Sequence, residues 1–336
     1  MKPSCVELCA GCGGLALGLE NSGFKTELVM DFDKSACETL RKNRPEWNVV
    51  HGDITKVTDW RSLLKDKTAE IDLLSAGIPC QAFSFAGKRL GTEDPRGQLY
   101  YSFRNAVNQF QPKVVLIENV KGLVSINNGQ TLKDFTEDLS SMGYTVTFKV
   151  LKATDFEVPQ KRERVIIVGT KGGCVFEFPK AIDADVSLNT VLREPITVPD
   201  VGVTYNEKKR RVMDLVPEGG CWVNLPEDVA KEYMGNSFYS GGGKRGIAKR
   251  LSRTEPSLTI LTSPAQKQTE RCHPTETRPL TVRESARIQT FPDDWVFCGG
   301  VGAQYKQIGN AVPVKLAEHV GHSIMNTIAN FANTTH

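Results

Sequence analysis

The amino-acid sequence predicts an α/β fold, in which a doubly wound, mostly parallel sheet carries helices on both faces, together with a smaller, irregular domain. Three observations lead to this prediction. Over the first 170 residues, short apolar runs alternate with amphipathic segments, as strands and helices do in such sheets. A glycine-rich turn at residues 11–16 separates the first apolar run from the first amphipathic segment. Beyond Pro179 the alternation stops, and Pro, Gly and charged residues predominate.

The apolar runs are the candidate strands, and the amphipathic segments between them are the candidate helices. The strands are expected at residues 4–9, 27–31, 48–51, 71–76, 114–118, 144–151 and 165–169. The helices are expected at residues 15–21, 34–42, 100–109 and 130–142. Because the last two strand candidates have no long helix between them, we expect an antiparallel hairpin at the edge of the sheet.

The weak periodicity of residues 180–278 predicts a second domain inserted into the first. We therefore expect a large domain at 1–179 and a return to it at 279–336. The return segment should contain helices at 281–289 and 314–327. In the second of these, apolar residues at helical spacing predict one buried stripe. The stripe consists of Leu316, Val320, Ile324 and Ile328.

The overall charge does not identify a partner, but its distribution is informative. The 336 residues include 42 Lys and Arg against 39 Asp and Glu, for a net charge of +3. Between Tyr239 and Arg271, however, there are seven basic residues and only two acidic ones. Such a stretch is either a surface that faces nucleic-acid phosphates or a solvated face, and its composition favours neither.

The nine cysteines are scattered, odd in number and accompanied by no secretory signal or long apolar segment. A cytosolic protein with reduced thiols is therefore the expectation. Cys9 and Cys12 have the C-x-x-C spacing of some metal and redox sites. No second pair and no nearby histidine pair accompanies them, so a metal site is not expected.

The turn Gly11-Cys12-Gly13-Gly14-Leu15-Ala16 fits the G-x-G-x-x-G/A pattern between a strand and a helix. Glycines there let the backbone approach a nucleotide closely. Asp31, about 20 residues further on and at a strand end, suits a ribose hydroxyl. Asp53 follows the third strand candidate and could accept from an adenine amino group. The pattern predicts a nucleoside cofactor but does not distinguish NAD from S-adenosylmethionine.

Cys80 follows the apolar run at 71–76 and lies next to Pro79, at the expected rim of the sheet. An exposed thiol near cations is suited to nucleophilic catalysis. The loop at 81–98 is rich in Gly, Lys and Arg, which is typical of a lid that touches phosphates. A zinc deaminase is excluded, because that class needs H-x-E and P-C-x-x-C and the sequence has neither.

Three more candidate catalytic residues accompany strand-like runs. Glu118 ends the run 114–118, where its carboxyl could share a proton with a ring nitrogen. Arg162 and Arg164 alternate along an extended segment, and we expect them to point to one face. Ordinary structural roles, a carboxylate that caps backbone N–H groups and a surface ion pair with Glu163, are the alternatives.

Six motifs occur in one order along the chain. They are the glycine loop at 7–14, Pro79-Cys80-Gln81, Glu118-Asn119-Val120, Gln160-x-Arg162-x-Arg164, the block at 278–292, and Gln307-Ile308-Gly309-Asn310-Ala311-Val312-Pro313. With these motifs the sequence resembles, over nearly its whole length, the cytosine-C5 DNA methyltransferases of bacterial restriction-modification systems. The resemblance implies a Rossmann-like, S-adenosylmethionine-dependent methyltransferase sheet. It also implies that 180–278 is a target-recognition domain for a specific short duplex DNA sequence.

The resemblance implies a role for each motif residue. Cys80 would add to C6 of a flipped-out cytosine, Glu118 would hydrogen-bond N3 and the amino group, Arg164 would hold O2, and Arg162 would orient the loop. The implied cofactor residues are Cys9, Ala10, Gly11, Gly13, Gly14, Asp31, Phe32, Asp53, Pro79, Leu99, Asn310 and Val312. The candidate DNA-binding residues are Gln81, Ser84, Lys88, Arg89, Arg96, Lys244, Arg245, Arg250, Arg253, Thr259 and Gln266. Cys9 departs from the family, which often has Phe there, and implies weaker stacking on the adenine.

Three other functions remain open on the sequence alone. They are an RNA (tRNA) cytosine-C5 methyltransferase on the same fold, an NAD-dependent oxidoreductase, and a DNA-binding scaffold without activity. The resemblance further implies a cytoplasmic, nucleoid-associated enzyme that acts as a monomer on DNA, with no membrane partner. A restriction endonuclease of the same specificity is the implied partner. The recognised DNA sequence cannot be read from these motifs.

Overall fold

The computed structural model of the chain describes residues 2–79, 95–239, 246–267 and 270–334. The chain forms two compact units. The sheet unit comprises Met1–Phe156, Glu163–Ile182 and Val312–His336, and the small unit comprises Glu157–Arg162 and Asp183–Ala311. Residues 279–311, expected with the large domain, thus belong to the small unit. The main chain explains this grouping, because Val282 N donates to Val201 O over 2.9 Å within that unit.

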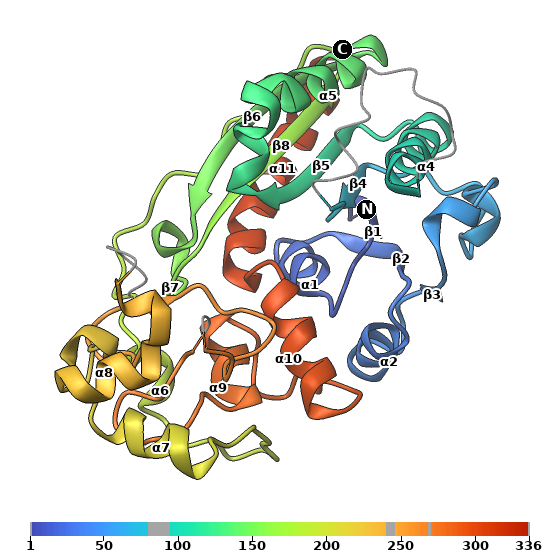
Figure 1. Cartoon of the computed structure of the whole chain (residues 1–336). Coiled ribbons are helices and arrows are strands. Elements are labelled where there is room, and N and C mark those ends of the chain that lie inside the picture. The colour runs from blue at the N-terminus through green and yellow to red at the C-terminus, as the bar shows by residue number, and fades with distance from the viewer. Residues whose placement is uncertain (1, 80–94, 240–245, 268–269, 335–336) are drawn as a thin grey trace. The chain divides into compact units, whose positions relative to one another are not determined.

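The sheet unit is built on a seven-stranded sheet of order β3-β2-β1-β4-β5-β8-β6 (Figure 1). Its strands are β1 (Ser4–Leu8), β2 (Lys25–Asp31), β3 (Val49–His51), β4 (Leu73–Ala76), β5 (Val114–Val120), β6 (Tyr144–Lys152) and β8 (Glu163–Lys171). The first five are parallel, whereas β8 runs antiparallel to both β5 and β6. All seven expected strands are present, and the expected antiparallel hairpin at the sheet edge is confirmed.

Helices cover the sheet where the amphipathic segments predicted them. They are α1 (Gly14–Asn21), α2 (Lys34–Asn43), α4 (Pro95–Phe110), α5 (Gln130–Ser141) and α11 (Val314–Thr334). Helix α2 begins at Asp33, whose carboxylate accepts from Ser35 N over 3.0 Å and Ala36 N over 3.2 Å, as an N-cap residue does. None of the described helices combines the length and hydropathy that a bilayer-spanning segment needs.

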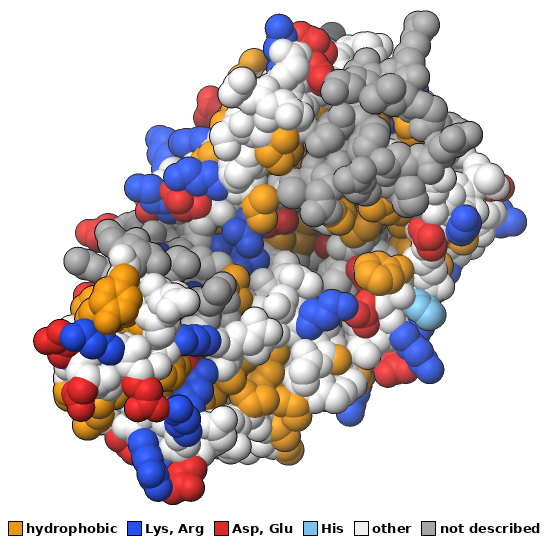
Figure 2. Space-filling view, viewed as in Figure 1, with side chains coloured by type: hydrophobic (Ala, Val, Ile, Leu, Met, Phe, Trp, Pro, Cys, Tyr) orange, Lys and Arg blue, Asp and Glu red, His pale blue; other side chains and the backbone are white. Residues whose placement is uncertain are grey.

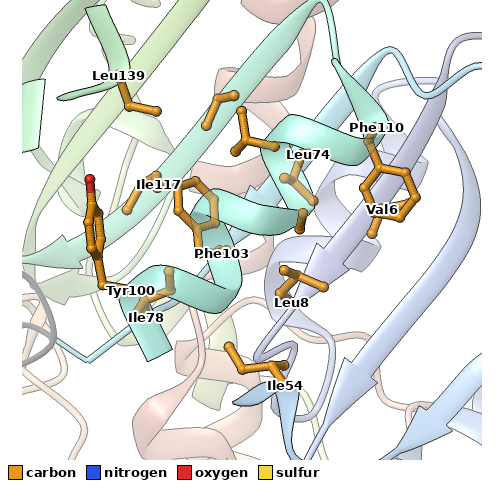
Figure 3. Close-up of a cluster of buried hydrophobic side chains, with 14 of the residues drawn as sticks. Val6, Leu8, Ile54, Leu74, Ile78, Tyr100, Phe103, Phe110, Ile117 and Leu139 are labelled. Atoms are coloured by element: carbon orange, nitrogen blue, oxygen red, sulfur yellow. The ribbon is translucent and has the colours of Figure 1, made fainter. Parts of the chain in front are cut away.

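The main core lies between the sheet and helices α4 and α5 (Figure 3). Val6 and Leu8 of β1 point to this face, since alternate residues of a strand share a face. Phe103 and Phe110 of α4 pack on them and are almost fully buried. Each such side chain contributes roughly 1.5–3 kcal/mol through burial.

Helix α11 packs closely on α1 within the sheet unit. Its predicted stripe is confirmed, because all four side chains are buried, namely Leu316, Val320, Ile324 and Ile328. Gly18 of α1 makes the approach possible. A Cβ at that position would lie 2.4 Å from Ala317 Cβ and 2.6 Å from Val314 O, closer than atoms can pack.

The small unit is irregular, as its sequence predicted. It contains α6 (Asn189–Leu192), α7 (Glu207–Asp214), α8 (Glu227–Met234), α9 (Val282–Ile288), α10 (Val301–Asn310) and the short parallel pair β7 (Gln160–Lys161) and β9 (Ser257–Leu258). A separate apolar cluster, which includes Met213, Met234 and Ile247, forms its core. Helix α9 begins with a capping box between Thr281 and Glu284.

The end of α9 contains a strained residue that provides a stability test. Thr290 has a φ of 61°, a conformation that is uncommon for any side chain and especially for a β-branched one. Glycine is favoured there, because it has no Cβ. We expect Thr290→Gly to raise the free energy of unfolding by about 0.5–1 kcal/mol, measured by chemical denaturation. Thr290→Ala keeps a Cβ and should gain less, and a Gly variant less stable than the parent would contradict this interpretation.

Candidate active site

Three carboxylates lie at or near the carboxyl ends of three parallel strands in the sheet unit. Glu7 is on β1, Asp31 ends β2 and Glu118 is on β5. The registers of β1 with β2 and β4, and of β4 with β5, place all three on the same face of the sheet. Ligands of open α/β sheets bind at this edge. The structure therefore brings together two of the predicted acids and adds a third, Glu7.

The glycine loop after β1 is held by Asp31. Residues Cys9, Gly11 and Gly13 have positive φ values of 57°, 55° and 90°, and this path turns the chain sharply into α1. Gly11 N donates to Asp31 Oδ2 and Asp33 N donates to Oδ1, each over 2.8 Å. Burial raises the pKa of Asp31, although these N–H groups oppose the shift. A carboxylate accepts about four hydrogen bonds, so Asp31 can also accept from a ligand hydroxyl.

Glu7 is a site residue whose side chain the sequence analysis gave no role. It is only 2% exposed, and its Oε2 has no hydrogen-bond partner among the described residues. Burial, and then the charges of Asp31 and Glu118, raise the pKa of Glu7 well above its usual range. A buried carboxyl with one oxygen unpartnered among the described residues can accept a hydrogen bond from a ligand N–H or O–H group. The signal in the sequence was an acid inside the otherwise apolar run of β1.

The cofactor candidates Cys9, Ala10, Gly14 and Phe32 lie in the glycine loop after β1 or directly follow β2. Ala10 N donates to Met30 O over 3.1 Å, and Gly14 begins α1. Burial, and then the charge of Asp31, raise the pKa of the Cys9 thiol to about 12, so it stays neutral. The ring of Phe32 is 72% exposed and free to stack on a flat ligand.

Other predicted cofactor residues have simpler surroundings. Asp53 accepts from Thr55 N over 2.8 Å and caps a short helix. Leu99, on α4, packs against the main core. Pro79 and Asn310 are exposed, whereas Val312 is buried. No metal-binding cluster of His, Cys, Asp and Glu occurs in the part of the chain that the structure describes.

Glu118 and Arg164 form an ion pair across β5 and β8. The antiparallel register pairs Arg164 with Val120, two residues beyond Glu118. Arg164 Nε lies 2.8 Å from Glu118 Oε1, and both side chains are largely buried. The approach is not aligned as a hydrogen bond, so the attraction is that of two charges. A carboxylate and a guanidinium are thereby held together at the sheet edge.

The described chain that ends at Pro79 is bonded to β5 at the residue next to Glu118. Asn119, next to Glu118, donates from Nδ2 to Ile78 O over 2.7 Å. That bond joins the chain just before Pro79 to β5. The Ile78 side chain is buried in the main core and holds the same point of the chain. Several predicted residues lie outside the described residues, namely Cys80, Gln81, Ser84, Lys88, Arg89, Lys244, Arg245 and the side chain of Arg96.

Arg162 has different partners from Arg164. It is 1% exposed and lies within the small unit. Its Nη1 donates to Ile260 O over 3.3 Å. Its Nη2 donates to Gly309 O over 3.1 Å and to Ala311 O over 2.9 Å. Arg162 therefore joins the Thr259–Ile260 segment to the loop that carries Asn310, a role that sequence spacing did not reveal.

Two buried glutamines extend this network. Gln160 Nε2 donates to Gln289 Oε1 over 2.8 Å, and Gln160 Oε1 accepts from Ile260 N over 2.8 Å. Gln289 Nε2 donates to Ile308 O over 2.7 Å. The main chains at 260 and 308–311 are thus held by a connected set of buried side chains, which restrains their movement.

Gly309 lies directly against the backbone of residues 261 and 262, next to the segment that this network holds. A Cβ there would lie 2.4 Å from Leu261 C and 2.5 Å from Thr262 N. We expect Gly309→Ala to lower the free energy of unfolding by about 3 kcal/mol, at the upper end for overpacking, as measured by chemical denaturation. Gly302, on the same helix, has open space around it, so Gly302→Ala is the matched control. Equal stability of the two variants would show that the 261–262 backbone moves freely.

Arg250, expected to contact DNA, is a structural residue of the small unit, and that prediction is wrong. Its guanidinium is buried. A guanidinium has five N–H groups, and all are used inside the unit. The acceptors are the carbonyls of Met213, Val216, His273 and Glu276 and the hydroxyl of Thr277.

Much of the remaining basic stretch is also paired. Arg271 is buried, and Arg253 forms a bidentate pair with Glu218, with two N–O distances of 3.1 Å. Lys and Arg side chains alternate with Asp and Glu over α7 and α8 (Figure 2). Among the described residues, the stretch is therefore not a continuous phosphate-facing patch. Thr259 is half-buried and Gln266 is exposed, and both stay candidates.

Comparison with known proteins identifies the family. The C-5 cytosine-specific DNA methylase model matches residues 4–326. The chain is 51% identical over 332 residues to the Type II methyltransferase M.Sau96I of Staphylococcus aureus, covering 97% of this chain and 76% of that protein. It is 51% identical over 335 residues to the Type II methyltransferase M.Eco47II of Escherichia coli, covering 96% and 79%.

Solved structures show the same fold at lower identity. A putative DNA modification methyltransferase of E. coli matches with a TM-score of 0.72 and 24% identity, covering 97% of this chain and 99% of that one. DNMT2 of Spodoptera frugiperda matches with a TM-score of 0.68 and 17% identity, covering 96% and 99%. Taken with the family match and the two bacterial relatives, the sheet and its motifs place this chain in the C-5 cytosine-specific DNA methylase family, as a DNA cytosine-5 methyltransferase of the Type II kind.

Proposed function

We propose that the protein methylates C5 of a cytosine within one short sequence of duplex DNA, through base flipping and a covalent bond between Cys80 and C6. The observation that carries the proposal is the Glu118–Arg164 pair. Asn119, the next residue, is bonded to Ile78, which precedes Cys80 by two residues in the sequence. Family membership implies DNA methylation with S-adenosylmethionine. A restriction endonuclease that cuts at the same sequence is the expected partner in the cell.

The residues at the sheet edge fit S-adenosylmethionine, which supplies an electrophilic methyl group when bound. Because Gly11 and Gly13 have no side chain, the ligand can approach the protein backbone closely at these two positions. The Asp31 carboxylate is placed for the ribose hydroxyls, and the exposed ring of Phe32 for the adenine. The Glu7 Oε2 atom, which has no partner among the described residues, can accept a hydrogen bond from the ligand. An NAD enzyme would leave that carboxyl and the Glu118–Arg164 pair without a use.

The chemistry assigns one step to each catalytic side chain. The Cys80 thiolate adds to C6 and forms an S–C6 bond, while Glu118 shares a proton with N3 and Arg164 holds O2. C5, made nucleophilic by this addition, would attack the methyl group of S-adenosylmethionine; the S–CH3 bond breaks, its electron pair stays on sulfur, and S-adenosylhomocysteine leaves. A base then removes the C5 proton, the S–C6 bond breaks and the thiolate is restored. C6 is inaccessible in stacked DNA, so the cytosine must leave the helix first.

Two measurements test this function. Purified protein should transfer labelled methyl groups from S-adenosylmethionine to duplex DNA, at cytosines that sequencing of a methylated plasmid will locate. With 5-fluorocytosine in that sequence, the C5 fluorine cannot leave as a proton does, so a covalent adduct should persist and map to position 80. Label in tRNA instead of DNA would support the RNA alternative, and competition by NAD would support an oxidoreductase. Methyl transfer without an adduct would refute the covalent mechanism.

A further inference from the structure

The segment at residues 259–264 of the small unit is held at both ends by one residue, Arg271. Arg271 Nε and Nη2 donate to Thr259 O over 3.2 and 3.0 Å. At the other end, Arg271 N donates to Pro264 O over 3.0 Å. A side chain and a backbone amide of the same residue thus span the segment and fix the distance between its ends.

Arg271 is itself firmly placed. Its Nη1 donates to Glu270 O over 2.7 Å, and its carbonyl accepts from Leu280 N over 3.0 Å. Cys272, the next residue, forms β-bridges with Arg250 and Pro279. The position that holds the 259–264 segment is therefore part of the rigid frame of the small unit.

Among the described residues, no carboxylate bonds directly to the buried guanidinium of Arg271. The side chain is 6% exposed, and its hydrogen-bond acceptors are neutral carbonyls. Burial lowers its pKa to about 10, only partly offset by the charge of Glu270. The Glu270 carboxylate is engaged elsewhere, by Lys209 and by Tyr233 Oη. Burying a guanidinium in this way costs free energy, which points to a purpose other than stability.

The held segment carries polar side chains in accessible positions. Thr262 is exposed within the segment, and Gln266 is exposed two residues after it, whereas Thr259 is half-buried and its hydroxyl donates to Lys161 O over 2.8 Å. Thr and Gln side chains can hydrogen-bond base edges in the major groove. Such contacts discriminate between bases only if the main chain that carries them holds its position, because hydrogen bonds weaken steeply with misalignment.

We propose that Arg271 is a positioning residue for target-sequence discrimination, which fixes the 259–264 segment before DNA arrives. The inference rests on the proposed sequence-specific methylation. It does not place Arg271 on DNA or on the cofactor. Loss of the Arg271 guanidinium should allow the segment to move at Thr259. Correct and incorrect sequences should then be methylated at more similar rates, while cofactor binding is unchanged.

The test compares Arg271→Met and Arg271→Lys with the parent enzyme. The readout is kcat/KM on the mapped sequence divided by kcat/KM on a duplex with one base pair changed. We expect the ratio to fall roughly tenfold in the Met variant, the size of a single lost base-pair preference. The Lys variant keeps the charge but carries all its N–H donors on one nitrogen instead of a planar fork, so it should retain part of the ratio. Arg211→Met, an exposed residue paired with Glu207, is the matched control and should leave it unchanged.

The outcomes separate this inference from the proposed function. If the parent enzyme methylates no DNA, the proposed function fails. If the parent discriminates and a folded Met variant keeps its ratio within about twofold, Arg271 does not position the segment. Equal loss on both duplexes, with the KM for S-adenosylmethionine unchanged, would likewise overturn the inference in favour of a general structural role. Where the Met variant does not fold, the Lys variant decides by the same ratio.

Discussion

A Cys80→Ser variant is expected to lose methyl transfer to DNA by at least about a thousandfold, as enzymes do when the nucleophile is removed. A serine hydroxyl is far less acidic than a thiol and is not ionised at neutral pH, so it adds poorly to C6. In the described part of the chain, Ile78, two residues before Cys80 in the sequence, is bonded to Asn119 of β5 over 2.7 Å. The measurement is single-turnover transfer of label to the mapped duplex.

The control for this variant is Cys174→Ser. Cys174 is a half-buried free thiol outside the site, so its replacement should leave transfer unchanged. The Cys80→Ser protein should still bind S-adenosylmethionine with the parent affinity, because the cofactor residues are separate. Transfer at the parent rate by Cys80→Ser would refute the assignment of the nucleophile.

Glu118→Gln is expected to lower the rate of methyl transfer by roughly 10²–10⁴, the range for loss of a general acid–base group. An amide has nearly the same shape but cannot share a proton with N3. It would also leave the Arg164 guanidinium, 2.8 Å away in the parent, without a negative partner in a largely buried position. The effect should fall on kcat rather than on the KM for the cofactor, measured with saturating DNA.

Glu163→Gln provides the matched comparison for Glu118→Gln. Glu163 is the neighbour of Arg164, is more exposed, and pairs with Lys121 at 3.0 Å. Exposed pairs contribute little to stability, and this carboxylate has no assigned step, so its replacement should change kcat less than about twofold. Equal effects of the two substitutions would show that charge near Arg164, rather than proton sharing, is what matters.

The fold was predictable because its signals are local. Short apolar runs and the glycine turn at residues 11–16 determine strands and the first connection without reference to distant parts of the chain. The same holds for Asp31, whose place at a strand end is visible in the sequence and whose carboxylate is bonded to Gly11 N. Glu118 and Arg164 followed from the same logic of strand ends.

The direction of charged side chains was not predictable. Arg250 and Arg271 belong to a basic stretch, and a count of charges cannot tell that both point inward to carbonyl groups. Arg162 and Arg164 alternate in sequence, yet the chain passes from the small unit to the sheet unit between them, so their partners differ. The direction of each of these arginine side chains depends on contacts between residues about 10 to 150 positions apart in the sequence. The spacing of apolar residues along the chain carries no information about such contacts.

Most of the described hydrogen bonds that hold the segment at 259–264 are made to its main-chain atoms. Arg271, Gln160 and Arg162 bond backbone atoms of residues 259, 260 and 264, and Gly309 meets the backbone of residues 261 and 262. The Thr259 hydroxyl, which donates to Lys161 O, adds a side-chain contact, and the Ile260 side chain is buried. An exposed side chain such as Thr262 can consequently change while the main chain keeps its place, which offers a route to new target sequences by single substitutions.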